Sequence, residues 1–199
     1  MGLISNGTTI FDNGSMASGF GGNLNFISKA TASASASIEF TSGIDSTYKE
    51  YVFYFVNMHP ATDEVSLGVN FSTDSGSNYN VTKTTTAFRS RHKEDGTNTA
   101  LEYRVDDDLA QSTGDKKLNA GVGNGNDECL SGYMHLFNPA STTFVKHFLT
   151  NTNEYGANNF SINYYHAGYG NTTSAINAVR FQMSSGNIDS GEILLFGVN

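Results

Sequence analysis

The chain has little cysteine, proline or charge, and it has no long apolar runs. Cys129 is its only cysteine among 199 residues, so no intramolecular disulfide can form and stability must come from packing. No apolar run approaches the length that a bilayer requires, and the N-terminal region lacks a basic segment followed by an apolar core. These absences predict a protein made in the cytoplasm, without a signal peptide and without membrane insertion.

Positive charge is also scarce. Lys and Arg total 11 against 19 Asp and Glu, which gives a net charge of −8 and a pI near 4.9. The basic residues look scattered, without a stripe, and the net charge repels phosphate backbones and anionic lipids. The sequence therefore predicts no nucleic-acid partner.

Turn residues and strand formers dominate what is present. Glycine occurs 21 times and proline twice, aromatic residues make up 12% and charged residues only 15%. Such a composition is typical of strands joined by Gly, Ser, Thr and Asn turns. A chain of this length can fold around one hydrophobic core and needs no second domain. We therefore predict an all-β fold, a single-domain antiparallel β-sandwich that is jelly-roll-like.

Individual strands can be read from apolar periodicity. Residues 51–56 form an unbroken β-branched and aromatic run, as expected of a strand covered on both faces. Residues 65–71 alternate apolar with small or polar side chains, which predicts one buried and one wet face. Asn138-Pro139 lies within a predicted hairpin. Further strands are expected at 24–27, 38–40, 132–137, 144–149, 162–165, 179–183 and 193–198.

The remaining segments divide the chain. Residues 1–22 are expected to form an N-terminal arm, too rich in glycine for a regular element, and residues 23–199 the β-sandwich. Within the sandwich, residues 83–127 carry few apolar side chains and are expected to be a loop-rich insertion crossed by two or three strands. Residues 101–105 and 117–122 are the candidates for these strands.

No catalytic or cofactor motif is recognisable. The chain lacks a nucleophile elbow, a phosphate loop and a dinucleotide fingerprint. Asp127 and Glu128 are expected to raise the pKa of the adjacent Cys129 thiol, which makes it a poor nucleophile. We therefore predict a protein that is not an enzyme, has no catalytic residues and binds no cofactor.

Two groups of residues are considered as metal ligands. Asp106, Asp107 and Asp108 are consecutive, and neighbouring residues of an extended chain point to opposite sides, which favours a solvated loop over a calcium site. His135 and His147 are expected to face each other in the predicted hairpin. Satisfied sheet histidines are favoured there over a zinc site, because further ligands are missing nearby. No metal site is predicted.

One aromatic cluster suits carbohydrate. Tyr164, Tyr165, His166 and Tyr169 lie among Asn and Gly, and they could form a stacking platform for a host glycan or receptor. Half-buried aromatics of a sandwich explain the same residues, and this second interpretation is favoured.

Four phrases carry a family resemblance: GLISNGTTIFDNGSM, FTSGIDSTYKEYVFYFVNMHPATD, LFNPASTTFVKHF and SSGNIDSGEILLFGVN. Together they resemble small virion structural proteins of tailed bacteriophages, common among marine phages of cyanobacteria and related hosts. The likeness rests on strands and turns and spans nearly the whole chain.

The resemblance implies a non-enzymatic subunit of the virion. It would be displayed on the surface as a capsid decoration or a tail-associated subunit, in contact with itself, most often as a homotrimer, and with other capsid or tail proteins. The alternative is a receptor- or glycan-binding (adhesin) module of a tail fibre or spike, used in host attachment. The apolar residues of the arm are the expected docking contacts: Leu3, Ile4, Ile10, Phe11, Met16 and Phe20.

Overall fold

The computed structural model describes residues 3–5, 8–12, 15–16 and 23–199. Every regular element in these residues is a β-strand, and none of the described residues forms a helix that could cross a membrane. The all-β prediction is confirmed. The strands are β1 (Leu3–Ser5), β2 (Thr8–Asp12), β3 (Ser15–Met16), β4 (Leu24–Thr31), β5 (Ile38–Phe40), β6 (Glu50–Pro60), β7 (Leu67–Ser72), β8 (Lys83–Lys93), β9 (Thr99–Tyr103), β10 (Lys116–Lys117), β11 (Leu130–Phe137), β12 (Lys146–Gly156), β13 (Phe160–Gly170), β14 (Ala178–Met183) and β15 (Ile188–Val198).

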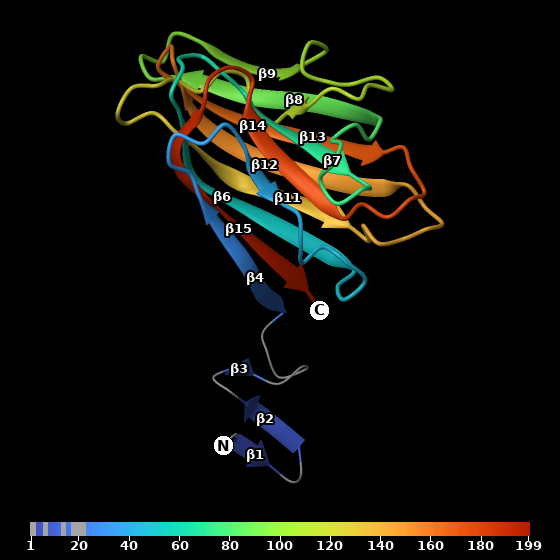
Figure 1. Ribbon diagram of the computed structural model, residues 1–199. Coiled ribbons are helices and arrows are strands. Elements are labelled where there is room, and N and C mark those ends of the chain that lie inside the picture. The colour runs from blue at the N-terminus through green and yellow to red at the C-terminus, as the bar shows by residue number, and fades with distance from the viewer. Residues whose placement is uncertain (1–2, 6–7, 13–14, 17–22) are drawn as a thin grey trace.

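Two antiparallel sheets make the sandwich. The larger has eight strands in the order β4-β15-β6-β11-β12-β13-β8-β9, and the smaller has four in the order β10-β7-β14-β5. Figure 1 shows the smaller sheet lying across one face of the larger, which we call the inner face. The opposite face of the larger sheet is the outer face. A jelly roll has eight strands in two Greek keys, and this strand order does not confirm one.

Aromatic side chains fill the space between the two sheets. Phe53 and Phe55 of β6 point inward and meet Phe181 of β14 edge to face, with ring centroids 5.4 and 5.2 Å apart. Phe71 of β7 meets Phe148 of β12 in the same way at 5.2 Å. All five rings are buried. Burying each contributes about 2–3 kcal/mol, so this layer holds the two sheets together.

The central strands follow the sequence prediction. β6 lies between β15 and β11, and β15, the last strand, lies between β4 and β6 rather than at an edge. The predicted hairpin around Asn138-Pro139 is the β11–β12 pair. The prediction that residues 51–56 are covered on both faces is only partly right, because Val56, on the outer face of β6, is 41% exposed.

The wet face predicted for residues 65–71 is wrong. Ser66, Asn70 and Ser72 are all buried. The segment around Asp115 packs over them: the Asn70 side-chain amide donates to Thr113 O at 3.0 Å and to Asp115 Oδ1 at 2.7 Å. A polar strand face can be buried at low cost once its hydrogen bonds are satisfied.

The loop-rich insertion is also partly wrong. Its first part, β8, is an eleven-residue strand that pairs along its whole length with β13. Prediction missed it because its inward side chains include Lys83, Thr85 and Arg89, which are buried although polar. β9 and the short β10 fall near the two strands expected in this region.

The N-terminal arm contains regular structure, contrary to prediction. β1, β2 and β3 form a three-stranded antiparallel sheet, separate from the two sheets of the sandwich. Figure 1 shows this small sheet beyond the β4 edge of the larger sheet. The glycines that argued against a regular element lie outside these three strands.

Candidate functional site

The predicted sugar platform is divided by the strand that carries it. Along β13, Tyr164 and His166 point to the inner face and are buried, with 0% and 3% exposure. Tyr165 and Tyr169 point to the outer face, where Tyr165 is 46% exposed. Side chains alternate along a strand, so a surface made of all four residues is excluded. Tyr164 and His166 must be removed from the predicted set.

Tyr164 and His166 belong to the interior. The Tyr164 hydroxyl accepts a hydrogen bond from Arg89 Nη1 at 2.9 Å and donates to Asp107 Oδ2 at 3.2 Å. The Tyr164 ring stacks on His166 at 5.3 Å. Burial, with Lys116 nearby, lowers the pKa of His166 to about 3, so this imidazole is neutral at physiological pH.

The outer face carries many exposed apolar side chains. A run of edge-to-face aromatic contacts crosses four strands, from Phe26 to Phe196 (5.6 Å), from Phe196 to Tyr54 (5.7 Å) and from Tyr54 to Tyr133 (6.4 Å). Beyond β12, Phe88 and Tyr165 lie opposite each other and stack at 5.1 Å with an interplanar angle of 10°. The more exposed apolar residues on this face are Leu24, Phe26, Val56, Phe88, Leu101, Tyr103, Tyr133, Leu149 and Tyr165.

A shallow depression of about 480 Å³ lies in the middle of the outer face. Phe88, Tyr133, Phe137, Leu149 and Tyr165 are among the residues that line it. The charges on this face are mostly paired: Lys29 Nζ lies 2.6 Å from Glu192 Oε1, and the His135 imidazole contacts Glu50. The outer face therefore carries few charged side chains, although the chain as a whole is acidic.

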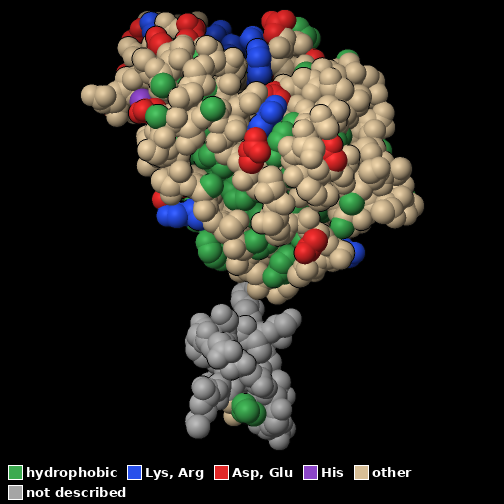
Figure 2. Space-filling view, viewed as in Figure 1, with side chains coloured by type: hydrophobic (Ala, Val, Ile, Leu, Met, Phe, Trp, Pro, Cys, Tyr) green, Lys and Arg blue, Asp and Glu red, His purple; other side chains and the backbone are tan. Residues whose placement is uncertain are grey.

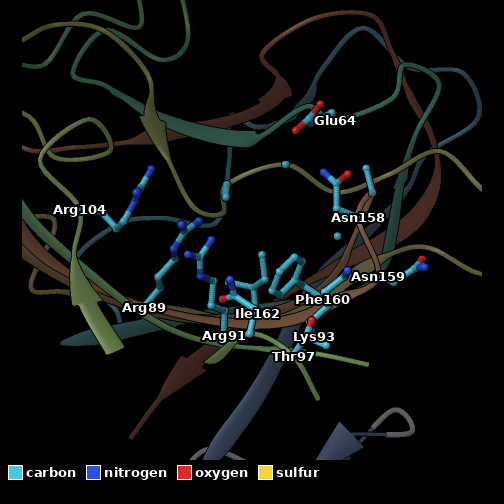
Figure 3. Close-up of a pocket in the computed structure, with 15 residues that line it drawn as sticks. Glu64, Arg89, Arg91, Lys93, Thr97, Arg104, Asn158, Asn159, Phe160 and Ile162 are labelled. Carbon is cyan, nitrogen blue, oxygen red and sulfur yellow. The ribbon is translucent and has the colours of Figure 1, made fainter. Parts of the chain in front are cut away.

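A second surface, the cationic cleft, lies where the inner face of β8 runs out from under the smaller sheet. It encloses about 870 Å³. Its floor carries Arg89, Arg91 and Lys93 of β8 and Phe160 and Ile162 of β13, which point into the same space (Figure 3). Figure 3 shows Glu64 across from the floor, with Arg104 and Asn158 at opposite ends of the cleft. Asn98, Ala120 and Gly121 also line it.

The alternation of β8 gathers these cations. Residues 89, 91 and 93 are two apart, so their side chains share one face of the strand. Figure 2 shows Lys, Arg, Asp and Glu gathered at the end of the molecule where Figure 1 places β8 and β9. The basic residues are therefore not scattered in space: the cleft contains three of the four arginines of the chain.

The arginines of the cleft differ in how they are held. Arg89 donates through Nε to Glu102 Oε1 at 2.7 Å and through Nη1 to Tyr164, and it is nearly buried. Arg91 lies over the Phe160 ring, 5.5 Å from its centroid, with its Nε 3.7 Å from the same Glu102 oxygen. Arg104 Nε donates to Asp107 Oδ2 at 3.2 Å. One carboxylate, Glu102, thus serves two guanidinium groups.

A buried carboxyl group lies beside the cleft. Glu154 of β12 is 1% exposed, and its side chain accepts hydrogen bonds from Asn119 Nδ2 and from the backbone N–H groups of Ala120 (3.3 Å) and Gly121 (3.4 Å). Burial raises its pKa. These bonds connect the segment that contains Ala120 and Gly121, which line the cleft, to the larger sheet.

The aspartate run is not a uniformly solvated loop. Asp106 is exposed, but Asp107 is 6% exposed and lies near Arg104, Lys117 and the Tyr164 hydroxyl. Arg104 is three residues away in the same segment, whereas Lys117 and Tyr164 come from other segments, which sequence spacing does not reveal. In the part of the chain that the structure describes, no three His, Cys, Asp or Glu residues are grouped as metal ligands would be.

The remaining candidates are placed as follows. His135 is opposite Leu149 and His147 is opposite Tyr169, so the two histidines do not face each other. The pKa of Cys129 is raised, as expected, but the cause is burial rather than its acidic neighbours. Among the arm residues, Leu3, Ile4, Ile10, Phe11 and Met16 lie on β1–β3, where Ile4 is exposed, and Phe20 lies outside the described residues.

In comparisons with known proteins, no family model, no curated protein and no solved structure matches this chain. Sequence reasoning missed the cationic cleft, although one signal was present. Arg89, Arg91 and Lys93 alternate with Ser90 and His92, which is the pattern of a strand with one basic face.

Proposed function

We propose that this chain is a non-enzymatic structural subunit of a bacteriophage virion, displayed on the particle as a capsid decoration or tail-associated subunit. We further propose that it assembles with copies of itself, as a homotrimer, through the outer face. The sequence resemblance supports the first statement. The observation that carries the second is the uncovered run of aromatic contacts across the outer face.

The outer face is large enough for a stable interface. Eight strands at a spacing of about 4.8 Å, several of them about 35 Å long, give a surface of roughly 1,000 Å². A specific interface buries about 800 Å² on each partner. Large exposed apolar patches are uncommon on monomers and mark sites of interaction.

Charge favours a second copy as the partner on this face. Each chain carries a net charge of −8, so two copies repel each other over most of their surfaces. The outer face carries few charged side chains: Lys29 is paired with Glu192, and Glu50 contacts the His135 imidazole. Aromatic residues are also enriched in the cores of interfaces between subunits.

The test places a charge in the middle of the outer face. Leu149 of β12 is 48% exposed, so Leu149→Lys removes little of the packing inside the sandwich. We expect the wild-type chain to be a trimer by light scattering at micromolar concentration and Leu149→Lys to be a monomer with unchanged circular dichroism, because a lysine buried without a partner is costly.

Ser42→Lys is the matched control. Ser42 is exposed in the connection between β5 and β6, away from the outer face, so the same added charge should leave the trimer intact. A monomeric wild type, or a Leu149→Lys variant that still forms trimers, would contradict assembly through this face. Electron microscopy of purified particles, with the sandwich located on capsid or tail, tests the virion assignment.

A receptor- or glycan-binding module is the second candidate function. The observation that favours it is the depression of the outer face, where the stacked Phe88 and Tyr165 rings and Tyr133 line a site of about 480 Å³. Aromatic rings beside amide groups suit the apolar faces of sugars. Glycan-array binding that is lost in Tyr165→Ala and retained in Tyr155→Ala would support this candidate over self-assembly.

A further inference from the structure

The cationic cleft concentrates positive charge in an acidic protein. Four basic side chains, Arg89, Arg91, Lys93 and Arg104, line it, against a single lining carboxylate, Glu64. The neighbouring acids do not balance them fully: Lys93 is paired with Asp95, but Glu102 is shared between Arg89 and Arg91, and Asp107 is shared between Arg104 and Lys117. Ion pairs that only stabilise the fold do not require more basic groups than carboxylates around the cleft.

Two of the guanidinium groups retain free donors. Arg89 is used by the fold, because Glu102 and Tyr164 hold it. For Arg91 and Arg104, by contrast, no described residue accepts a hydrogen bond from either Nη atom; Arg104 is bonded only through Nε, and Arg91 only approaches Glu102 through Nε. A pair of Nη donors matches the two oxygens of a carboxylate or a sulfate.

Neutral polar groups also line the cleft. Thr97 and Asn98 of the β8–β9 turn and Asn158 of the β12–β13 turn are among its lining residues, together with the ring of Phe160. In Figure 3 Asn158 lies across the cleft from Arg104, with Arg89, Arg91 and Phe160 between them. Amide and hydroxyl groups around an aromatic ring complement sugar hydroxyls and an apolar sugar face.

We propose that the cationic cleft binds an acidic saccharide, a sugar that carries a carboxylate or sulfate group. Arg91 and Arg104 hold the anionic group, and Asn158 and Thr97 bind sugar hydroxyls. The cleft volume of about 870 Å³ falls within the range of about 300 to 1,000 Å³ that is usual for small-ligand sites. The site is on the inner face, so it is separate from the outer face that the proposed assembly uses.

The test measures binding of a heparin-derived tetrasaccharide to the full chain by calorimetry at low salt. We expect binding that weakens as salt increases, and a loss of affinity of at least about tenfold in Arg91→Ala. Arg91→Lys should fall between the two, because it keeps the charge but loses the planar fork. Thermal unfolding checks that each variant is folded.

Lys29→Ala is the charge-matched control. Lys29 also forms an ion pair, with Glu192, but it lies on β4 at the far edge of the larger sheet, so its removal should leave affinity unchanged. Neutral maltotetraose should not bind. Equal affinity for inorganic sulfate would overturn the saccharide as ligand, and so would equal affinity for a short single-stranded oligonucleotide. Unchanged binding in Arg91→Ala would overturn the site itself.

Discussion

Lys116 has no exposed surface, and its Nζ donates only to main-chain oxygens, those of Asp107 and Lys117. Lys83 is buried in a similar way, with Asn70 Oδ1 at 2.6 Å and Val81 O at 2.8 Å. Burial lowers the pKa of Lys116 from 10.5 to about 7 and that of Lys83 to about 8. No carboxylate of the described residues pairs directly with either lysine, so each buried charge is a cost to the fold.

This cost predicts a pH dependence of stability. The pKa of Lys116 is lower in the folded chain than in the unfolded chain, so between about pH 7 and 10.5 the unfolded chain holds a proton that the folded chain has released. The free energy of unfolding must then rise with pH across this window. Lys116→Met removes this titration. The free energy of unfolding of this variant should therefore rise less with pH than that of the wild type, by a difference of about 1 kcal/mol or more.

Urea unfolding at pH 7 and pH 10 measures the difference. Lys49→Met, at an exposed position, is the control and should keep the wild-type rise. Lys83 titrates in all three proteins, so its contribution cancels in the comparison. Equal rises in Lys116→Met and in the wild type would show that the Lys116 ammonium is not destabilised by burial.

At the scale of elements, the contact between β11 and β12 depends on one residue without a side chain. A Cβ on Gly132 would overlap the Asn151 carbonyl oxygen and lie 2.7 Å from Thr152 Cα. Both atoms belong to the backbone of the paired strand, which cannot move without breaking the ladder. We expect Gly132→Ala to lower the free energy of unfolding by about 2–4 kcal/mol.

Chemical denaturation of Gly132→Ala beside Gly114→Ala checks this prediction. Gly114 precedes β10, and a Cβ there would meet only the Ser112 hydroxyl oxygen at 3.4 Å. The control should therefore change stability by less than about 1 kcal/mol. A similar fall in the free energy of unfolding in both variants would mean that glycine acts through the unfolded chain rather than through the close approach of β11 and β12.

Strands differed in how far sequence could predict them. β15 was predictable because Ile193 and Leu195 belong to the continuous apolar run of residues 193–196. β8 was not, since buried Lys83, Thr85 and Arg89 gave it the composition of a loop. Their burial depends on partners that are distant in sequence, such as Asn70 and Tyr164, and no local pattern reveals those partners.

At the scale of the whole molecule, the arm and the sandwich are separate sheets. Among the described strands, β1–β3 pair only with one another, and the sandwich begins at β4. Deleting residues 1–22 should therefore leave the melting temperature of the sandwich within a few degrees of the wild type. We also expect the truncated chain to be absent from purified particles if the arm docks it there.

Calorimetry of the truncated chain and its copy number in purified particles test the two parts separately. A large fall in melting temperature would show that the arm stabilises the sandwich. Normal copy number would show that attachment runs through the sandwich instead. Deletion of the exposed turn residues 95–97, between β8 and β9, is a control for loss of chain without loss of the arm.

The sequence by itself determined the class of fold and much of the strand order along the chain. Period-two apolar patterns and turn residues depend only on neighbours in sequence, and they decide which segments extend and where they turn. The same alternation places neighbouring residues on opposite faces of β13, so the sequence alone could have assigned Tyr164 and Tyr165 to different faces.

Only the tertiary structure decided which face of each strand is covered. The smaller sheet lies over one part of the larger sheet and leaves the outer face and the end of β8 open, and this depends on pairings between distant strands such as β6 with β15. Burial of Lys83, Lys116 and Glu154 and the gathering of Arg91 with Arg104 follow from the same packing. Long-range contacts set the surroundings of each side chain, and the surroundings, rather than residue type, set its chemistry.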